Sequence, residues 1–351
     1  MLKIEKTQLE LLEKLTNAVA PSGDEGAVRK LVRAEVEDLA DEIKTDMMGN
    51  LLVTKRGTGK NRLRVMLAAH MDEVGFMLVH KEKEGIFRFE TLGGIDPRQA
   101  VGKPVWVGRE KTPGVIGAAP VHLLSAEERK RKVSLKSLRI DVGLDDANLK
   151  AGDRGAFATK FMRMGESLRA KALDDRLGVA ILIELLRHAP PNLDLLAAFT
   201  VQEELGLRGA KTAAHALNPD LALAVDSTPA YDFPRHDGEE NIRYNTKLGA
   251  GPALYTMDGR TISDPRLIRW LSESGDAQGI PYQYRQPGRG GTDAGSIHLS
   301  RAGIPAASIS VPGRYAHTAL GLCRISDWEN TLNLLHAALH NLTPKMLENP
   351  R

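Results

Sequence analysis

Apolar runs of strand length alternate with stretches of helical period along most of the chain. Four runs are almost continuously apolar: VMLAA (65–69), LLAAFTV (195–201), LALAV (221–225) and AASISV (306–311). Strands that are buried on both faces of a sheet have this pattern, and parallel strands need connections long enough for a helix. The chain is therefore predicted to adopt an α/β fold, in which a mixed sheet carries helices on both faces.

The stretches between these runs have the period of amphipathic helices. Helices are expected over residues 174–188, about 207–217, 264–278 and about 327–342. The segment before the first strand predicts two further helices and a hairpin. The first helix is Leu9–Ala18, and the second follows the turn APSGDEG and runs to about Ala40, with Ser22 and Glu25 at the spacing of a capping box. The segment EIKTDMMGNLLVTKRG (42–57) alternates around a turn, as a β-hairpin does.

The pattern changes between residues 75 and 164. This segment consists of short apolar runs broken by Gly and Pro, and no long helical period survives in it. Such a pattern is typical of a small β-barrel-like domain. We therefore expect a catalytic domain formed by residues 1–74 and 165–351, with a β-domain at 75–164 inserted into one of its loops.

Composition narrows the class of protein. The chain has 351 residues, enough for two domains, and its 48 basic and 45 acidic residues are well mixed, which is no nucleic-acid signature. The basic stretch at 128–139 is interrupted by apolar residues and is interpreted as a solvated surface. A single cysteine, Cys323, excludes an intramolecular disulfide and a cysteine-rich zinc site. No signal-peptide pattern or membrane-length apolar run is present, so no membrane partner and a cytoplasmic location are expected.

Candidate metal ligands stand where the apolar runs end. They are His70 and Asp72 after the first run, Glu203 and Glu204 after the second, Asp226 after the third, His317 in the loop after the fourth, and Asp174 at the start of a helix. Because the carboxyl ends of strands in α/β sheets open into the crevice that binds ligands, these side chains are expected to meet there. A two-metal hydrolytic site is the leading hypothesis.

Each group also has a structural interpretation. His70 and Asp72 lie two residues apart, so on an extended strand they share a face, and the carboxylate could orient a metal-bound imidazole. A buried structural pair of histidine and acid is the alternative. Asp174 could bridge two cations through its two oxygens, whereas a helix cap is the alternative. Asp175 is expected to cap the helix or to support the ligands.

Glu203 and Glu204 are expected to have different roles. One carboxylate would bind metal, and the other would stay unligated as general base to a metal-bound water. Two unpaired buried carboxylates would be costly without cations beside them. With Asp226 and His317 the ligand set contains nitrogen and oxygen but no thiolate, which suits zinc, cobalt or manganese.

Two other motifs are weaker indications of a functional site. His336 and His340 lie four residues apart, but Ala337 stands where a zincin helix has its Glu, so an ordinary helix face is expected. The glycine-rich stretch 288–295 is expected to be a turn in which Thr292 or Asp293 caps a helix, and a role in lining the active site is the alternative.

Five stretches together resemble one family. HMDEVGFM (70–77), KALDDRLGVA (171–180), VQEELGLRGA (201–210), LALAVDSTPA (221–230) and the segment 291–318 are similar to the tetrahedral (TET) metallo-aminopeptidases, which include glutamyl and deblocking aminopeptidases and relatives formerly labelled endoglucanases. The resemblance covers nearly the whole chain. It implies metal ligands at His70, Asp174 (bridging), Glu204, Asp226 and His317, with Glu203 as general base and Asp72 as the carboxylate that supports His70. It also implies a co-catalytic metallopeptidase fold, a PDZ-like or barrel-like insertion used in dimerisation, and a homo-oligomer, a dodecamer built from dimers.

The predicted function is a two-metal aminopeptidase that hydrolyses N-terminal residues from peptides, with Glu203 as general base on a metal-bridging water. A metal-dependent deacylase or amidohydrolase is the alternative within two-metal chemistry. A glycoside hydrolase of the endoglucanase type would use the two glutamates but leaves the histidines and Asp226 without a role. A scaffold that binds peptides without cleaving them is a further alternative. The charged stretch 227–246 departs from the family pattern and is expected to line the site entrance, which leaves the preferred N-terminal residue open.

Overall fold

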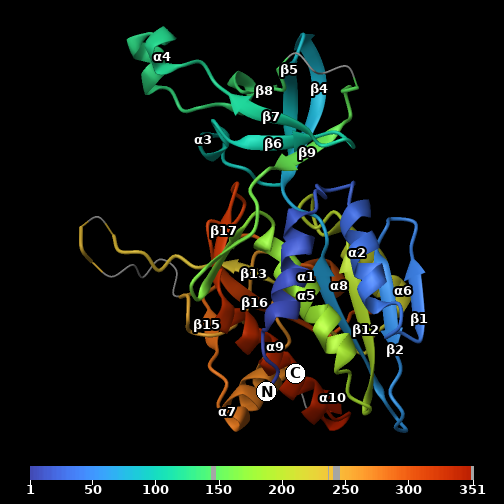
Figure 1. Cartoon of the computed structure of the whole chain (residues 1–351). Helices are drawn as coiled ribbons and strands as arrows, with labels where there is room; N and C mark the ends of the chain where they lie inside the picture. The colour runs from blue at the N-terminus through green and yellow to red at the C-terminus, as the bar shows by residue number, and fades with distance from the viewer. Residues whose placement is uncertain (144–147, 236, 240–245, 349–351) are drawn as a thin grey trace.

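The four apolar runs form adjacent parallel strands in the middle of one large sheet (Figure 1). The computed structural model describes residues 1–143, 148–235, 237–239 and 246–348. The central strands, in sheet order, are β12 (Leu193–Thr200), β3 (Leu63–His70), β13 (Leu221–Pro229) and β16 (Ala306–Arg314). Their carboxyl ends therefore meet at one edge of the sheet.

Antiparallel strands extend this sheet on both sides. The expected hairpin is β1 (Glu42–Thr45) and β2 (Leu51–Lys55), and β2 pairs with β12. The other side carries β17 (Gly321–Arg324), β11 (Ser167–Ala170) and β10 (Met162–Met164), and two short strands, β14 (Ala253–Tyr255) and β15 (Gln283–Arg285), join it through β16. The sheet is thus mixed, as predicted.

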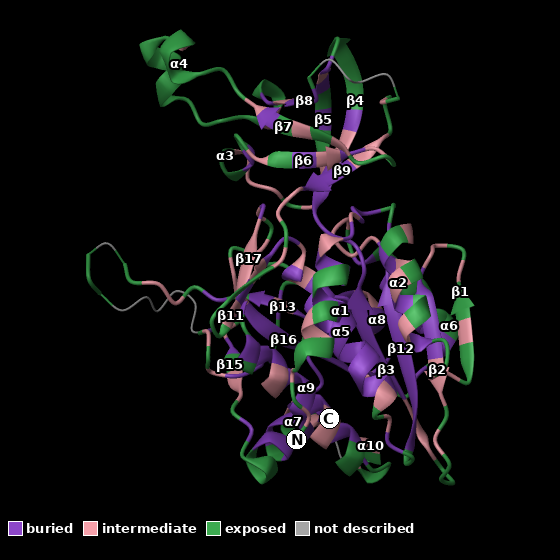
Figure 2. Cartoon of the chain, in the orientation of Figure 1, coloured by how far each residue is buried: buried purple, intermediate pink, exposed green. Residues whose placement is uncertain are grey.

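Alternate residues of the central strands face opposite layers of helices. In β3, Val65, Leu67 and Ala69 belong to one apolar cluster, whereas Met66 and Ala68 belong to another. The first cluster contains side chains of α1 (Lys6–Asn17), α2 (Gly26–Val36), α5 (Leu173–Arg187), α7 (Pro265–Gln278) and α9 (Ile325–Asn341). The second contains side chains of α6 (Arg208–Leu217) and α8 (Ala294–Ile297). Each large apolar side chain buried in this way contributes roughly 1.5–3 kcal/mol, which explains why the runs are almost entirely apolar (Figure 2).

The segment after β3 forms a separate closed barrel above the sheet (Figure 1). Its strands are β4 (Gly75–Lys83), β5 (Ile86–Leu92), β6 (Pro104–Val107), β7 (Thr112–Gly117), β8 (Arg139–Asp141) and β9 (Arg154–Phe157). The ring of Phe76 packs edge-on against Phe89 and Phe157, with centroids 5.2 and 5.0 Å away. The predicted fold class is confirmed, and the division of the chain into domains at residues 75 and 164 stays a prediction.

Short helices complete the described chain. They are α3 (Pro97–Ala100), α4 (Ala126–Lys130) and the 3₁₀ turns Val121–Leu123 and Leu135–Ser137 in the barrel segment, with α10 (Lys345–Glu348) near the C-terminus. The basic stretch around α4 is largely exposed on an arm that leaves the barrel (Figure 2). Within the described residues, no helix is long and apolar enough to cross a membrane.

The expected capping box before α2 is not formed. The N-cap residue is Glu25, and α2 ends at Val36 rather than near Ala40. The Ser22 hydroxyl instead donates to Asp72 Oδ2 at 2.6 Å. Asp72 is completely buried and needs donors, so a distant carboxylate takes the hydroxyl that the local sequence pattern assigned to the helix.

A buried ionic cluster connects the residues that follow β3, the C-terminal end of α1 and the start of α5. Lys171 donates to both Glu73 oxygens at 2.7 and 2.8 Å and to the carbonyl of Ala18 at 2.7 Å. Arg176 donates to the carbonyls of Met71 and Leu15 at 3.0 and 2.6 Å, and its Nη2 lies 3.5 Å from Glu73. The cluster fixes Glu73 beside Asp72, and it fixes residues on both sides of Asp174.

Replacing Lys171 with Met should destabilise the fold by about 3 kcal/mol, because removing one partner leaves the other buried charge poorly compensated. Urea unfolding of the purified variant measures this. The matched control is Lys6→Met, which removes an exposed pair with Glu10 whose side chains are 90% and 55% exposed. The control should unfold at the wild-type midpoint, and equal midpoints for both variants would contradict a structural role for the buried cluster.

Candidate metal centre

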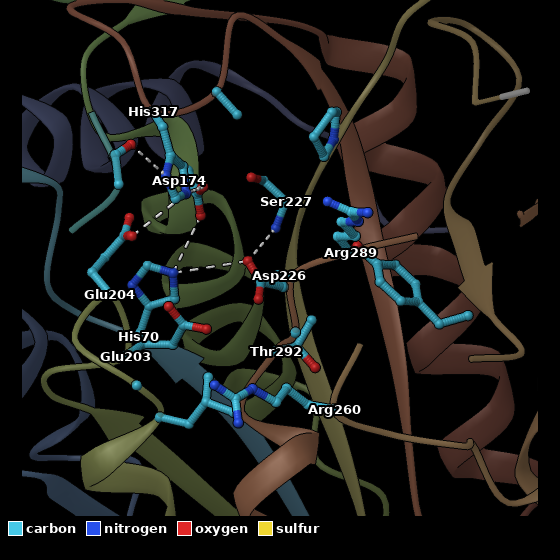
Figure 3. Close-up of a pocket in the computed structure, with 18 of the residues that line it drawn as sticks. His70, Asp174, Glu203, Glu204, Asp226, Ser227, Arg260, Arg289, Thr292 and His317 are labelled. Carbon is cyan, nitrogen blue, oxygen red and sulfur yellow. Dashed lines mark hydrogen bonds and ion pairs between the residues drawn. The ribbon is translucent and has the colours of Figure 1, made fainter. Parts of the chain in front are cut away.

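A cavity of about 410 Å³ opens at the carboxyl ends of the central strands (Figure 3). Of the residues predicted for the site, His70, Asp174, Glu203, Glu204, Asp226 and His317 all line it. They come from five places in the chain: the ends of β3 and β13, the turn after β12, the start of α5 and the loop after β16. The structure therefore brings these six residues together.

Five of the six form two groups with the spacing of metal ligands. One group is His70, Asp174 and Asp226, the other is Asp174, Glu204 and His317, and within each group the ligand atoms lie within 4.8 Å of one another. Asp174 belongs to both. Its Oδ1 lies 3.2 Å from Nε2 of His70, and its Oδ2 lies 3.5 Å from Nε2 of His317. The two oxygens thus face different groups, which is the geometry that a bridging carboxylate needs.

The remaining distances complete each group. Asp226 Oδ1 lies 3.8 Å from His70 Nε2, and Glu204 Oε2 lies 3.4 Å from His317 Nε2. Close packing of α5 against β13 sets the approach of Asp174 to Asp226. Gly178 permits it, because an added Cβ there would lie 2.6 Å from the Val225 carbonyl oxygen.

Main-chain carbonyls orient both imidazoles. Nδ1 of His70 lies 3.1 Å from the Asp72 carbonyl oxygen, and Nδ1 of His317 lies 3.0 Å from the Gly94 carbonyl oxygen. A proton on Nδ1 that is donated to a carbonyl leaves Nε2 as the ligand atom, and Nε2 is the atom that faces the carboxylates in both histidines. Gly94 follows β5, so the barrel segment contributes one support of the site.

The Asp72 carboxylate contacts both His70 and the turn after β12, and its role in supporting the imidazole stays a prediction. Its carboxylate lies 3.5 Å from His70 Nδ1, farther than its own carbonyl oxygen. The carboxylate accepts hydrogen bonds from the main-chain N–H groups of Glu203 and Glu204 at 3.1 and 3.2 Å, in addition to the Ser22 hydroxyl. Asp72 therefore holds the turn that presents both glutamates.

Asp175 combines the two roles that the sequence left open. Its Oδ1 accepts from the N–H of Gly178 at 3.0 Å, which is a helix cap, and its Oδ2 accepts from the N–H of His70 at 3.2 Å. It is fully buried and belongs to neither ligand group. Asp175 thus links the start of α5 to the end of β3.

The carboxylates of the site shift one another's pKa and that of the neighbouring imidazole. Burial raises the pKa of Glu204 to about 7, with Asp174 adding to the shift, and burial also raises the pKa of Asp226 well above its ordinary value. Burial alone would lower the pKa of His317, but Glu204 and Asp174 outweigh it and raise the pKa to about 10. The donor set of imidazole nitrogens and carboxylate oxygens fits two divalent metal ions.

Glu203 lines the cavity without belonging to either ligand group. Burial raises the pKa of its carboxyl well above the ordinary value, and Asp226 and Glu204 add to the shift. It points toward the same space as the ligands (Figure 3). An unligated carboxyl of high pKa at this position is able to accept and return a proton.

The glycine-rich stretch 288–295 lies at the site, and of the two residues predicted as helix caps, Thr292 rather than Asp293 accepts a hydrogen bond from the start of α8. Arg289, Gly290, Gly291 and Thr292 line the cavity. Asp293 is at the N-cap of α8, but its Oδ2 accepts from the Thr200 hydroxyl at 2.5 Å, and the N–H of Ala294 lies 3.3 Å from Thr292 Oγ1 instead. Thr200 ends β12, so the side chain links α8 to the sheet.

Some lining residues were missed by sequence reasoning. Tyr255 lines the cavity from β14, Arg285 from β15, and Arg260 from the loop between β14 and α7. Strands β14 and β15 have only three residues each, too few for a periodic signal.

Positions 236 and 240–245 of the expected entrance stretch lie outside the described residues. His336 and His340 lie on α9 and belong to neither ligand group.

Comparison with known proteins gives consistent matches over nearly the whole chain. Residues 49–334 match the family described as M42 glutamyl aminopeptidase. A putative aminopeptidase of Acetivibrio thermocellus is 36% identical, with 95% of this chain and 99% of the relative covered. A lysyl aminopeptidase of Pyrococcus furiosus is 33% identical (95% and 97% covered), and a glutamyl aminopeptidase of Lactococcus lactis is 33% identical (97% and 99% covered).

Solved structures agree with these matches. The TET aminopeptidase of a marine sediment archaeon, Thaumarchaeota archaeon SCGC AB-539-E09, has a TM-score of 0.91 at 33% identity, covering 98% of this chain and 99% of that one. The TET1 peptidase of Pyrococcus horikoshii, which can assemble into a tetrahedron or a large octahedral shell, has a TM-score of 0.82 at 34% identity, covering 95% and 100%. Each similarity extends over both the sheet and the barrel.

If Asp174 bridges two cations, Asp174→Asn should reduce the binding of both, whereas His317→Gln should reduce only one, because His317 belongs to a single group. Stripped protein is dialysed against zinc or cobalt, and the metal bound per chain is measured by inductively coupled plasma mass spectrometry. Wild type is expected to hold two ions, His317→Gln one and Asp174→Asn fewer than one. Asp276→Asn, a change on the exposed face of α7, is the control. Two ions per chain in Asp174→Asn would refute the bridge.

Proposed function

Because the chain belongs to the M42 glutamyl aminopeptidase family, we propose that it is a two-metal aminopeptidase that removes N-terminal residues from peptides. The family makes it an enzyme that hydrolyses peptide bonds. One observation carries the finer proposal: two ligand groups share Asp174 beside an unligated Glu203 in one cavity. The resemblance noted in the sequence is confirmed at the level of the family.

His70, Asp174 and Asp226 would hold one cation, and Asp174, Glu204 and His317 the other. Zinc or cobalt suits this donor set best, and manganese fits its oxygen ligands. When bound, two such ions lower the pKa of a water molecule and stabilise negative charge on a carbonyl oxygen. The other parts of the reaction fall to side chains of the chain itself.

Glu203 is the proposed general base. As the water oxygen attacks the scissile carbonyl carbon, the Glu203 carboxylate accepts a proton from that water. The Glu203 carboxyl group then donates the proton to the amide nitrogen as the C–N bond breaks. Asp72 fixes the Glu203 main chain through the 3.1 Å hydrogen bond, so the carboxylate is held in place before substrate binds. The proton is returned within one turnover and no additional donor is needed.

The family also supports a homo-oligomer, and we propose a dodecamer built from dimers, as the tetrahedral assembly of the Pyrococcus horikoshii relative suggests. The barrel segment is the proposed dimerisation element. Its arm exposes Val121 and Leu123, which are 65% and 72% accessible in the single chain. Apolar side chains at such exposure favour contact with another subunit.

Removal of residues from free N-termini, and not from blocked ones, is the expected activity. A peptide mixture in which each sequence is present with a free and an acetylated N-terminus is incubated with cobalt- or zinc-loaded protein and sampled by mass spectrometry. Stepwise shortening of the free peptides alone, abolished by a chelator, is expected. Loss of only the acetyl group would make the protein a deacylase. Activity on cellulose derivatives that resists the chelator would favour glycoside hydrolysis instead.

Glu203→Gln should keep both metal ions and lose turnover by about 10²–10⁴-fold, because the amide cannot accept the proton. Metal content and kcat are measured on the same preparation. Glu204→Gln is the matched contrast, since it changes the neighbouring residue in the same way but removes a proposed ligand, and it should lose metal. A Glu203→Gln enzyme with wild-type turnover would rule out the general base assignment.

A further inference from the structure

The loop that carries Glu203 and Glu204 closes on itself. This glutamate loop (residues 201–209) runs from the end of β12 into the first turn of α6. The N–H of Gly209 donates to the carbonyl oxygen of Val201 at 3.0 Å, so the two ends of the loop meet at a neck. Both glutamates line the cavity. A group that holds the neck therefore also helps to position both carboxylates.

The backbone of the glutamate loop is strained. Gln202 and Leu207 are not glycines, yet their φ angles are 55° and 59°, in the left-handed region. Residues with a side chain seldom adopt this conformation, and they keep it only where the surrounding structure enforces it. The loop therefore depends on hydrogen bonds from other parts of the chain to keep its shape.

Asn50 lies at the neck and bonds both ends of the loop. It follows the turn between β1 and β2, and β2 lies beside β12 with Leu51 opposite Phe199 (Figure 1). This pairing brings Asn50 to the residue that begins the loop. Its Oδ1 accepts from the N–H of Val201 at 3.0 Å, and its Nδ2 donates to the carbonyl oxygen of Gly209 at 3.0 Å. One carboxamide thus joins the two ends.

The surroundings of Asn50 fix the orientation of this carboxamide. Its Nδ2 also donates to Asp46 Oδ2 at 2.7 Å and to the Thr212 hydroxyl at 2.9 Å. The three neighbours of Nδ2 all offer an acceptor oxygen, whereas the neighbour of Oδ1 is a donor, so one orientation satisfies the group. Asn50 is completely buried, and it is not among the residues that line the cavity. It therefore acts on the site only through the loop.

The two contacts at the neck require a carboxamide. Val201 presents an N–H and Gly209 presents a carbonyl oxygen, so the side chain between them needs one acceptor and one donor. Aspartate has the same size and keeps the acceptor, but it places a second acceptor against the Gly209 carbonyl and the Asp46 carboxylate. Leucine has neither group and would leave both main-chain groups without this partner, which is costly in a buried place.

We propose that Asn50 is a positioning residue for the reaction, because it closes the loop that presents the general base Glu203 and the metal ligand Glu204. The proposal rests on the proposed function and adds to it a residue outside the cavity. Asp72 bonds the N–H groups of both glutamates in the middle of the loop, whereas Asn50 bonds the ends.

Opening the neck should affect the two cation sites differently. Glu204 belongs only to the group that it forms with Asp174 and His317, and the other group contains no residue of the glutamate loop. A displaced loop should therefore weaken the binding of one cation and leave the other in place. General unfolding would release both.

Asn50→Asp should hold one ion per chain in the dialysis experiment used for Asp174→Asn. With excess metal it should bind peptide with little change in KM, and its kcat should fall by about 10–100-fold, because a residue that orients a ligand or base has an effect of this size. The matched control is Asn333→Asp. Asn333 is a buried asparagine that accepts from the N–H of Leu2 at 2.7 Å and donates to the carbonyls of Leu2 and Glu329 at 2.9 Å each. The control should keep two ions and the wild-type kcat.

Hydrogen–deuterium exchange of the metal-free protein tests the loop itself. A proteolytic peptide that covers residues 201–209 should exchange roughly tenfold faster in Asn50→Asp than in wild type, since a buried hydrogen bond at the neck is lost. Asn333→Asp should leave this peptide unchanged. If Asn50→Asp does not fold, Thr212→Val, which removes one acceptor of Nδ2 at an exposed position, should shift exchange and kcat in the same direction by a smaller factor.

Two ions per chain with wild-type kcat and wild-type exchange in Asn50→Asp would overturn the proposal. Loss of both ions together, or an equal loss of kcat in Asn333→Asp, would also overturn it, because either result indicates a general loss of stability. A wild-type protein that cleaves no peptide would instead reject the aminopeptidase function, while the ion counts and the exchange rates would still test the role of Asn50 at the neck.

Discussion

The mutual repulsion of carboxylates at the end of the central strands is the constraint on which the rest of the structure depends. Asp174, Glu204 and Asp226 are gathered within ligand distance of two histidines, and Glu203 lies beside them. Such a cluster is stable only if cations or protons neutralise it. The surrounding contacts hold these groups in place: buried ion pairs flank Asp174, and hydrogen bonds with main-chain groups position Asp72 and both imidazoles. The fold maintains an arrangement that these side chains would not adopt by themselves.

Much of this arrangement was predictable because strand ends are visible in the sequence. An apolar run that stops at a polar residue marks both the strand and the side chain at its mouth, as at His70, Glu203 and Asp226. The alternation of β3 residues between two helix layers explains why those runs are continuous and why the fold class could be predicted. Asp174 was recognisable as well, since it opens a long helical pattern.

The partners of those side chains were not predictable to the same degree. Ser22 looked like a helix cap and binds Asp72 instead, and Asp293 binds Thr200 across the sheet. In both cases the side chain pairs with a buried group distant in sequence rather than with the N–H groups at the start of the helix, because an unpaired buried polar group is costly. Arg260 and Arg285 gave no signal, since the first lies in a loop and the second on a strand of three residues. The local sequence pattern determines where helices and strands form, whereas tertiary contacts determine which groups become hydrogen-bond partners.

The ligand groups and the arginines that line the cavity lie in different kinds of chain segment. The ligand groups lie at the ends of central strands and at the start of a helix that packs against them. A shift of one residue in the pairing register of such a strand would turn its buried side chains to the opposite face of the sheet. Two of the arginines stand in loops, and the third is on a strand of three residues that pairs with β14. Substitutions in such segments disturb little of the core. The ligand groups are therefore constrained by the fold, while the arginines of the cavity lie in segments that can change independently of it.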